Sequence, residues 1–180
     1  MDKHDIILST AEQLFAREGF RATGVDRLLE PAGVSTRTLY KHFGSKNGLA
    51  LAILKRRDNR FFAAMNAGVD GADPVTGIFD VLLDWVRDEE GTGCPFLRAL
   101  GEYHSEDPEI AAFAQIHKQR MRVLIAERVA MAVGAPDPRL ADQIWLLFEG
   151  ATAAVAVAGS TMVEAARDAA RILVSATSKG

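Results

Sequence analysis

The chain has 180 residues, of which 48% are hydrophobic and 25% charged, and its formal net charge is −3 at pH 7. This length allows one domain, or a small domain fused to a larger one, and the composition excludes the disordered, collagen-like and fibrous classes. The single cysteine, Cys94, cannot form an intrachain disulfide, which fits a reducing compartment. The first 15 residues contain no apolar run of signal-peptide length, so we expect a cytoplasmic protein.

The charges are unevenly distributed along the chain. Residues 1–60 contain 11 Lys and Arg against 7 Asp and Glu, a net charge of +4, whereas residues 61–180 contain 10 against 17, a net charge of −7. Most charge runs are solvated helix faces, so charge alone leaves the function open. A basic first third on an acidic remainder nevertheless suggests two modules with different partners.

Helical periodicity begins at the start of the chain, and strand patterns are nearly absent. The first apolar stripe consists of Ile7, Ala11, Leu14 and Phe15, and Gly19 follows it as a helix C-cap would. These residues predict a first helix that ends at Gly19.

Two short helices are expected next. The second runs over residues 23–32 with Thr23 as its N-cap, although Pro31 should loosen or shorten its last turn. The third is capped by Ser35 and runs through His42, because Gly44 stops it.

Six further helices are separated by breaks rich in Gly, Pro and Asp. The stretch from Ile144 to Ala158 is apolar, but it contains Glu149 and is shorter than the roughly 18 residues of a membrane span, so we interpret it as a buried helix. The chain is predicted to be all-α, with about nine helices. It is divided into an N-terminal three-helix domain over residues 1–46 and a larger helical domain over residues 47–180. The six later helices are expected from the cap Ser45 to about Val69 and at residues 75–90, 96–104, 108–133, 138–158 and 162–177.

The third helix has two chemically different faces. Leu39 and Phe43, four residues apart, point toward the core. A short helix packed by one side suits recognition in a DNA major groove, although a helical hairpin with a polar surface explains the same pattern. The polar side chains on the opposite face and its edge are Thr36, Arg37, Thr38, Tyr40 and Lys41.

The segment from Ala11 to Leu54 closely resembles the DNA-binding domain of TetR/AcrR-type transcriptional regulators. The resemblance rests on LFAREGF (14–20), Thr23, Val25, AGVSTRTLYKHFGSK (32–46) and Leu49, and it covers about a quarter of the chain. The remaining helices match the family by architecture, as a ligand-binding and dimerisation domain. The resemblance implies a ligand-responsive regulator, most often a repressor, that binds a palindromic operator as a homodimer and is released by a small-molecule effector.

The resemblance also implies which residues contact DNA. Contacts with DNA phosphates are assigned to Thr23, Tyr40 and His42. Lys46 lies in the first turn of the fourth helix, where a cation opposes the helix dipole, and its position makes sense if a phosphate docks there.

Contacts with the edges of DNA bases are assigned to Arg37 and Thr38, and Arg37 is able to pair with guanine. Ser35 is chiefly a helix cap that is also placed to donate to a phosphate. The complete predicted DNA-binding set is Thr23, Ser35, Thr36, Arg37, Thr38, Tyr40, Lys41, His42 and Lys46.

Aromatic residues at helical spacing in the larger domain are most often core residues. The resemblance implies that part of this core opens to hold the effector. For Glu149 a salt bridge, across the dimer or to a neighbouring helix, is the preferred explanation, because an unpaired buried carboxylate is costly. The predicted ligand-binding set is Trp85, Phe96, Tyr103, His104, Phe113, His117, Trp145 and Glu149.

No metal site and no redox role are predicted. Glu102 and His104 are two residues apart and do not share a helix face, which argues against a metal site with His117. Cys94 has no partner cysteine and is interpreted as a small packed side chain.

The last two helices contain closely spaced small residues, which let another helix approach. Packing within the chain explains them equally well, but the resemblance implies a four-helix interface with a second copy. The predicted dimerisation set is Phe148, Ala151, Val155, Ala158, Val163, Ala166, Ala170 and Leu173.

An enzyme is not expected, because the sequence contains no nucleophile elbow, no paired metal-ligand spacing and no glycine-rich phosphate loop. No cofactor and no membrane association are predicted. The expected partners are a double-stranded DNA operator, a small-molecule effector and a second copy of the chain. The alternative is a helical adaptor, or a small-molecule-binding protein, that retains a vestigial DNA-binding head.

Overall fold

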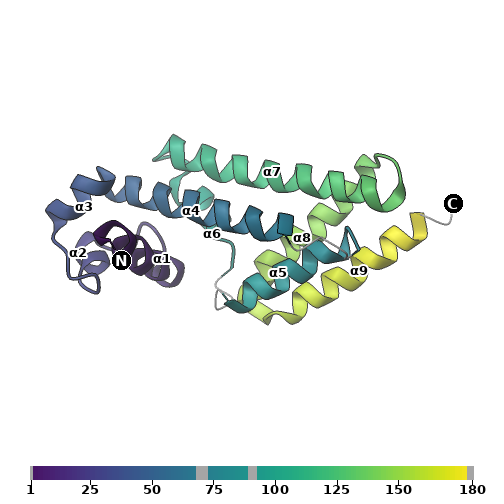
Figure 1. Cartoon of the computed structure of the whole chain (residues 1–180), viewed down its shortest axis with the longest axis horizontal. Helices are drawn as coiled ribbons and strands as arrows, with labels where there is room; N and C mark the ends of the chain where they lie inside the picture. The colour runs from purple at the N-terminus through teal and green to yellow at the C-terminus, as the bar shows by residue number, and fades with distance from the viewer. Residues whose placement is uncertain (1, 68–72, 89–92, 178–180) are drawn as a thin grey trace. The chain divides into compact units, whose positions relative to one another are not determined.

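The computed structural model describes residues 2–67, 73–88 and 93–177, and within them it has nine helices and no strand (Figure 1). The all-α prediction is confirmed. The predicted ends of the fourth and fifth helices, at residues 69 and 90, lie outside the described residues. The helices are α1 (Lys3–Glu18), α2 (Val25–Leu29), α3 (Thr36–Phe43), α4 (Lys46–Ala67), α5 (Thr76–Asp88), α6 (Pro95–Tyr103), α7 (Pro108–Val133), α8 (Pro138–Ala158) and α9 (Thr161–Thr177).

The chain forms two compact units, and both are discontinuous in sequence. The head unit comprises Met1–Asn59 and Pro95–His117, and the body unit comprises Arg60–Cys94 and Lys118–Gly180. Each unit therefore contains part of α4 and part of α7. The division into a DNA-binding domain over residues 1–46 and a second domain after it concerns function, and it stays a prediction. The compact head unit is larger than that domain, because it also contains α6.

The start of the head unit follows the predicted apolar stripe. Ile7, Ala11, Leu14 and Phe15 are all buried in α1. Gly19 ends the helix with a φ of 90°, and its N–H donates to the carbonyl of Phe15 at 3.0 Å. Because this φ is unfavourable for residues with a Cβ, the glycine explains why the chain turns here.

The second helix is shorter than predicted and begins later. It covers only Val25–Leu29, and its N-cap is Gly24, so the prediction that Thr23 caps it is wrong. The Thr23 hydroxyl instead donates to the carbonyl of Gly19 at 2.6 Å, which ties the turn to the end of α1. The helix ends before Pro31, as expected, because proline has no backbone N–H to donate, although Glu30 before it still has helical φ and ψ of −51° and −52°.

The caps of the next two helices are confirmed. Ser35 Oγ accepts the backbone N–H of Thr38 at 3.3 Å, and Ser45 Oγ accepts that of Gly48 at 2.9 Å. Leu39 is fully buried, as expected. Phe43 is only half-buried, because its ring stacks on the side chain of His4 at 4.9 Å rather than entering the core completely.

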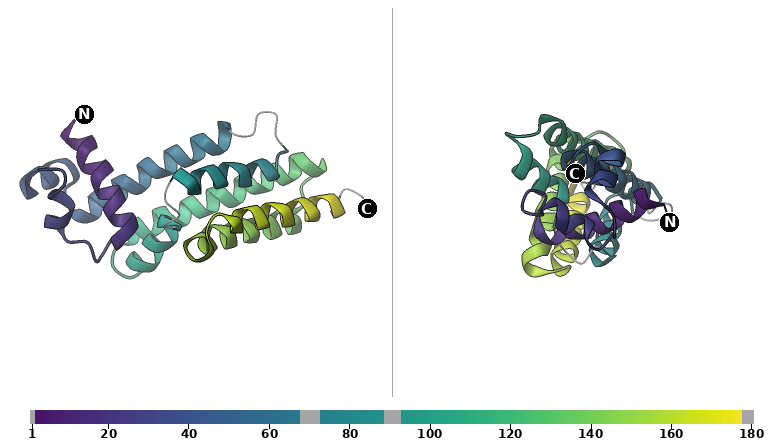
Figure 2. Two further views of the ribbon diagram at one scale, coloured as in Figure 1. Left: turned by 90° about the horizontal axis from the view of Figure 1, so that it is seen from below. Right: turned by 90° about the vertical axis from the view of Figure 1, so that its left-hand side faces the viewer.

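The body unit is built around helices α5, α8 and α9, which lie side by side (Figures 1 and 2). Its core combines side chains from α4 and α7 with these three, among them Met65, Phe79, Ile125, Ile144 and Val163. Among the described helices, only α8 is long and apolar enough to cross a membrane, and a third of its apolar window is buried. A core helix of a soluble protein has the same length and composition, so this is weak evidence for a membrane span.

Most of the predicted dimerisation residues belong to this core of the body unit. Their side chains pack against the chain's own helices, and their role in an interface with a second copy stays a prediction. Of the other two, Ala158 is exposed and Leu173 packs partly against the core. The buried members, each at most 8% exposed, are Phe148, Ala151, Val155, Val163, Ala166 and Ala170.

Candidate nucleic-acid interface

The polar face of α3 is open to solvent. Arg37 and Lys41 are exposed, and neither forms an ion pair with a carboxylate in the described part of the chain. They are one helical turn apart, so both point to the same side. The ring of Tyr40 is half exposed beside them, and Thr36 and His42 are exposed as well. This face offers two uncompensated positive charges to a negatively charged ligand.

Three hydroxyl side chains of the predicted DNA-binding set already have hydrogen-bond partners. The hydroxyls of Ser35 and Thr38 are 3.0 Å apart, and Ser35 caps the helix as well. Thr23 is only 1% exposed, with its hydroxyl bound to the Gly19 carbonyl. Ser35 and Thr38 therefore lie at the surface of the candidate interface, whereas the Thr23 side chain supports it from within.

The turn between α1 and α2 is held by carboxylates from α6 and the residues after it. Glu102 Oε2 accepts the backbone N–H of Arg21 at 2.7 Å, and Glu106 pairs with the Arg21 guanidinium at 2.6 Å. Lys46 Nζ donates to the carbonyl of Arg21 at 3.0 Å. We name Arg21, Lys46, Glu102 and Glu106 the turn clasp.

The electrostatics of Lys46 reflect this arrangement. Partial burial lowers its pKa, Glu102 opposes the shift and Arg21 adds to it. The predicted position of Lys46 in the first turn of α4 is confirmed. Its ammonium, however, is bound to a carbonyl of the chain, so a phosphate at this point would share it with the Arg21 backbone.

Two further contacts from the same segment hold the head together. Arg98 on α6 donates to the carbonyls of Phe15 and Ala16 at 3.1 and 2.6 Å, which satisfies the C-terminal end of α1. Asn47 donates to the carboxylate of Asp107 at 2.8 Å. Sequence reasoning missed these roles, because the partners are 60 to 83 residues apart and no local pattern relates them.

The predicted ligand-binding residues do not form one group. In the head unit, His117 is buried, binds Asp58 at 2.7 Å and stacks on Phe96 at 3.5 Å between ring centroids. Phe113 lies 6.5 Å from the same Phe96 ring. These residues form a packed cluster around the buried contact between His117 and Asp58.

The two remaining predicted ligand residues of the head unit lie elsewhere. Tyr103 is buried, and its ring lies 6.0 Å from that of Phe20. Burial, with the nearby carboxylates of Glu102 and Asp107, raises the pKa of Tyr103 to about 12. His104 is exposed.

The other three predicted ligand residues are in the body unit. Trp85 packs edge-to-face on Phe61 at 5.2 Å, and the Trp145 ring lies 5.6 Å from the Arg122 guanidinium. Glu149 forms a salt bridge of 2.7 Å with Lys118 on α7, which confirms the explanation preferred from the sequence. Burial by itself lowers the pKa of Lys118, but Cys94 and Glu149 outweigh it and raise that pKa above its usual value.

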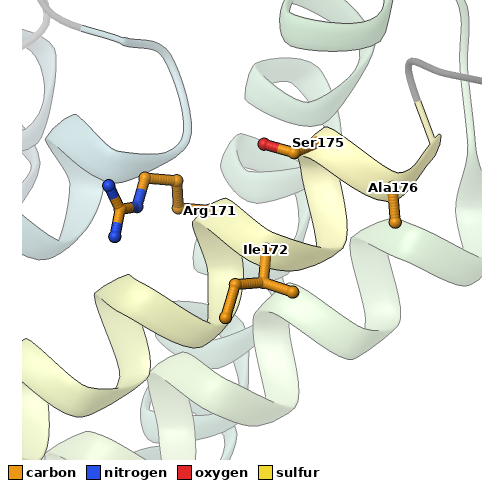
Figure 3. A pocket seen from close by; sticks show the side chains of 4 residues that line it. All are labelled: Arg171, Ile172, Ser175 and Ala176. Carbon is orange, nitrogen blue, oxygen red and sulfur yellow. The ribbon is translucent and has the colours of Figure 1, made fainter.

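A surface hollow lies on the exposed side of α9 and contains none of the predicted ligand residues (Figure 3). The hollow is lined by Arg171, Ile172, Ser175 and Ala176.

In the described part of the chain, no three His, Cys, Asp or Glu side chains gather as metal ligands would.

Comparison with known proteins relates the chain to one family of regulators. Residues 7–53, which contain all of α2 and α3, match the model described as bacterial regulatory proteins, tetR family. The solved structure of SCO4454, a TetR-family transcriptional regulator from Streptomyces coelicolor, superposes with a TM-score of 0.90 at 25% identity. That match covers 98% of this chain and 96% of the other. The match over residues 7–53 and the shared fold make this chain similar to TetR-family regulators.

Curated relatives agree with this similarity over part of their length. The transcriptional regulator TcmR of Streptomyces glaucescens is 34% identical over 92 residues, 49% of this chain and 41% of TcmR. The transcriptional activator FasR of Mycolicibacterium smegmatis is 29% identical over 115 residues, 61% of this chain and 51% of FasR. The chain thus spans about half or less of the relatives' length. By these similarities the chain resembles helix-turn-helix transcriptional regulators.

Proposed function

We propose that this TetR-like protein acts as a cytoplasmic repressor that binds a palindromic operator as a homodimer and leaves it when a small molecule binds. The observation that carries the DNA-reading part is the pair Arg37 and Lys41, exposed one turn apart on α3 without carboxylate partners among the described residues. Cations that are not neutralised within the chain are available to phosphates and to guanine edges. A two-fold dimer presents two such helices to the two halves of a palindrome.

The proposed DNA contacts divide into two groups. Arg37 and Thr38 read base edges, because they lie on the outward face of the helix that a groove would receive. Phosphate contacts fall to the residues at its rim. These are Ser35, Thr36, Tyr40, Lys41, His42 and Lys46, with the buried Thr23 supporting the turn.

The proposed dimer face is the outer side of α8 and α9. Leu146 and Val157 are 63% and 91% exposed, and Ile172 on α9 is 66% exposed. Gly150 and Ala153 lie between the first two at helical spacing, so small exposed side chains separate the large ones along one stripe of α8. Such a stripe allows two helices to approach closely, and burying it removes apolar area from water.

Selection of bound sequences from random DNA tests the DNA-reading part. We expect the purified chain to enrich a palindrome, and Arg37→Ala and Tyr40→Ala to weaken binding to it. Lys46→Ala should lower the slope of log affinity against log salt by about one. Arg139→Ala, an exposed arginine on α8, is the matched control and should have no effect. Enrichment of no palindrome, or full affinity in the Arg37 and Tyr40 variants, would contradict the proposal.

Repression itself is tested with a reporter gene placed behind the selected operator. The proposal requires expression to fall when the regulator is present and to recover with an effector. The relative FasR is named an activator. A rise in expression would therefore contradict repression and show that the regulator activates the gene.

A further inference from the structure

Helices α7 and α8 share a polar seam inside the body unit. Lys118 on α7 pairs with Glu149 on α8 at 2.7 Å, and Arg122, one turn further along α7, pairs with Asp142 at 2.7 Å. The Arg122 guanidinium also lies over the ring of Trp145. The residue numbers of the paired side chains increase along α7 while they decrease along α8, so the two helices run antiparallel here.

Two buried polar atoms in this seam have no hydrogen-bond partner among the described residues. They are the indole Nε1 of Trp145 and the carboxylate Oε1 of Glu149. A buried donor or acceptor without a partner is costly, so most such atoms in folded proteins bind another group. The sequence contains both residues, but only the fold shows that one atom of each is left unsatisfied.

The two atoms belong to side chains on the same side of α8. Residues four apart on a helix are neighbours, with roughly 5–6 Å between their Cβ atoms. Trp145 and Glu149 both reach toward α7, because Arg122 covers the ring of the first and Lys118 binds Oε2 of the second. The seam therefore contains one unsatisfied donor and one unsatisfied acceptor on residues one turn apart along α8.

We propose that Trp145 Nε1 and Glu149 Oε1 form a subsite for the hydroxyl group of an uncharged small molecule, the effector of the proposed function on which this inference rests. A hydroxyl oxygen can accept from the indole N–H while its proton is donated to the carboxylate. Lys118 neutralises Glu149, so the subsite has no net charge to recruit an ion. The indole face supplies an apolar wall for the body of the molecule.

Three probes of similar shape separate the two hydrogen bonds. Phenol both donates and accepts, anisole only accepts, and toluene does neither. Titrations of the intact protein, followed by isothermal calorimetry and ligand-observed NMR, should give saturable binding in the order phenol, anisole, toluene. Each lost hydrogen bond should weaken binding about threefold to tenfold.

Trp145→Phe is the diagnostic variant, because it removes the N–H and keeps an aromatic ring. It should weaken phenol binding about threefold to tenfold and leave toluene binding unchanged. Asp80→Asn, which weakens an exposed ion pair with Arg167 in the same unit, is the control and should bind phenol normally. Circular dichroism melting checks that both variants are folded.

The proposal is overturned if phenol and toluene bind the intact protein equally, or if no probe binds saturably. It is also overturned if Trp145→Phe binds phenol with full affinity. In those cases a buried water satisfies the two atoms. Operator binding is measured on the same preparations without any probe, so a failure of the DNA-binding proposal is seen separately.

Discussion

Glu102 at the end of α6 accepts the backbone N–H of Arg21, 81 residues earlier in the chain, at 2.7 Å. This contact joins α6 to the turn that precedes the helix-turn-helix. The side chain of the same Arg21 pairs with Glu106, and Lys46 binds the Arg21 carbonyl. In the turn clasp, carboxylates thus lie beside two cations at the edge of the proposed interface, where DNA phosphates would compete with them.

Replacing Glu102 by Gln should strengthen DNA binding. The amide oxygen can still accept the Arg21 N–H, but a negative charge beside Lys46 is removed, so we expect about twofold to fivefold tighter binding at low salt. Fluorescence anisotropy with the selected operator, at two salt concentrations, measures it. Glu127→Gln, an exposed carboxylate on α7, is the control. Equal gains in both variants would mean that only net charge matters and that the turn clasp has no local effect.

Tyr103→Phe should change how the free energy of unfolding depends on pH above pH 10. The pKa of Tyr103 is raised to about 12 in the folded chain, from 10.0 for an ordinary tyrosine. Stability due to the neutral phenol is therefore complete below pH 10 and is lost as the pH rises from 10 to 12. The variant should lose less stability over this interval, as measured by urea unfolding at several pH values.

At pH 7 the same Tyr103→Phe substitution should be neutral, or stabilising by up to about 1 kcal/mol, because the buried hydroxyl has no hydrogen-bond partner among the described residues. Tyr40→Phe, at a half-exposed ring, provides the comparison. Parallel profiles for the native chain and Tyr103→Phe above pH 10 would refute the prediction.

Asp58→Ala should be among the most destabilising single changes in the head unit. The Asp58 and His117 side chains are 4% and 5% exposed and are joined at 2.7 Å, so the variant leaves a buried histidine without this partner. Losing one member of a buried pair costs about 3–5 kcal/mol, whereas an exposed pair contributes about 1 kcal/mol or less. Urea unfolding of Asp58→Ala and of Asp80→Ala, which breaks an exposed pair with Arg167, measures the difference. Similar losses in both would show that the buried pair has no special weight.

Val157→Glu should break self-association. Val157 is 91% exposed on the proposed dimer face, and a two-fold interface would bring the two introduced carboxylates close together. We expect the dimer dissociation constant to rise more than about tenfold, measured by light scattering across a dilution series. Val123→Glu, at a 58% exposed valine on α7, should leave the dimer intact. Dissociation by Val123→Glu and not by Val157→Glu would place the interface on α7 instead.

The helices themselves follow from local chemistry, and the sequence therefore predicts them well. Gly19 and the cap Ser35 mark boundaries that the structure reproduces, because capping and positive φ depend on near neighbours. The exception is Thr23, whose hydroxyl prefers the carbonyl of Gly19 to the start of α2. Both bonds are local, so the sequence alone does not decide between them.

By itself the sequence determined the helical class, the apolar stripe of α1, the exposed Arg37 and Lys41 of α3 and the need of Glu149 for a cation. Each of these depends on spacing along one helix or on the cost of burying a charge. Only the tertiary structure decided that Lys118 is that cation and that Ala151, Ala166 and Ala170 of α8 and α9 face inward. It also decided that Glu102 of α6 and Glu106, which follows α6, hold Arg21. These outcomes depend on contacts between residues far apart in the chain, and several helix faces of similar composition compete for each contact.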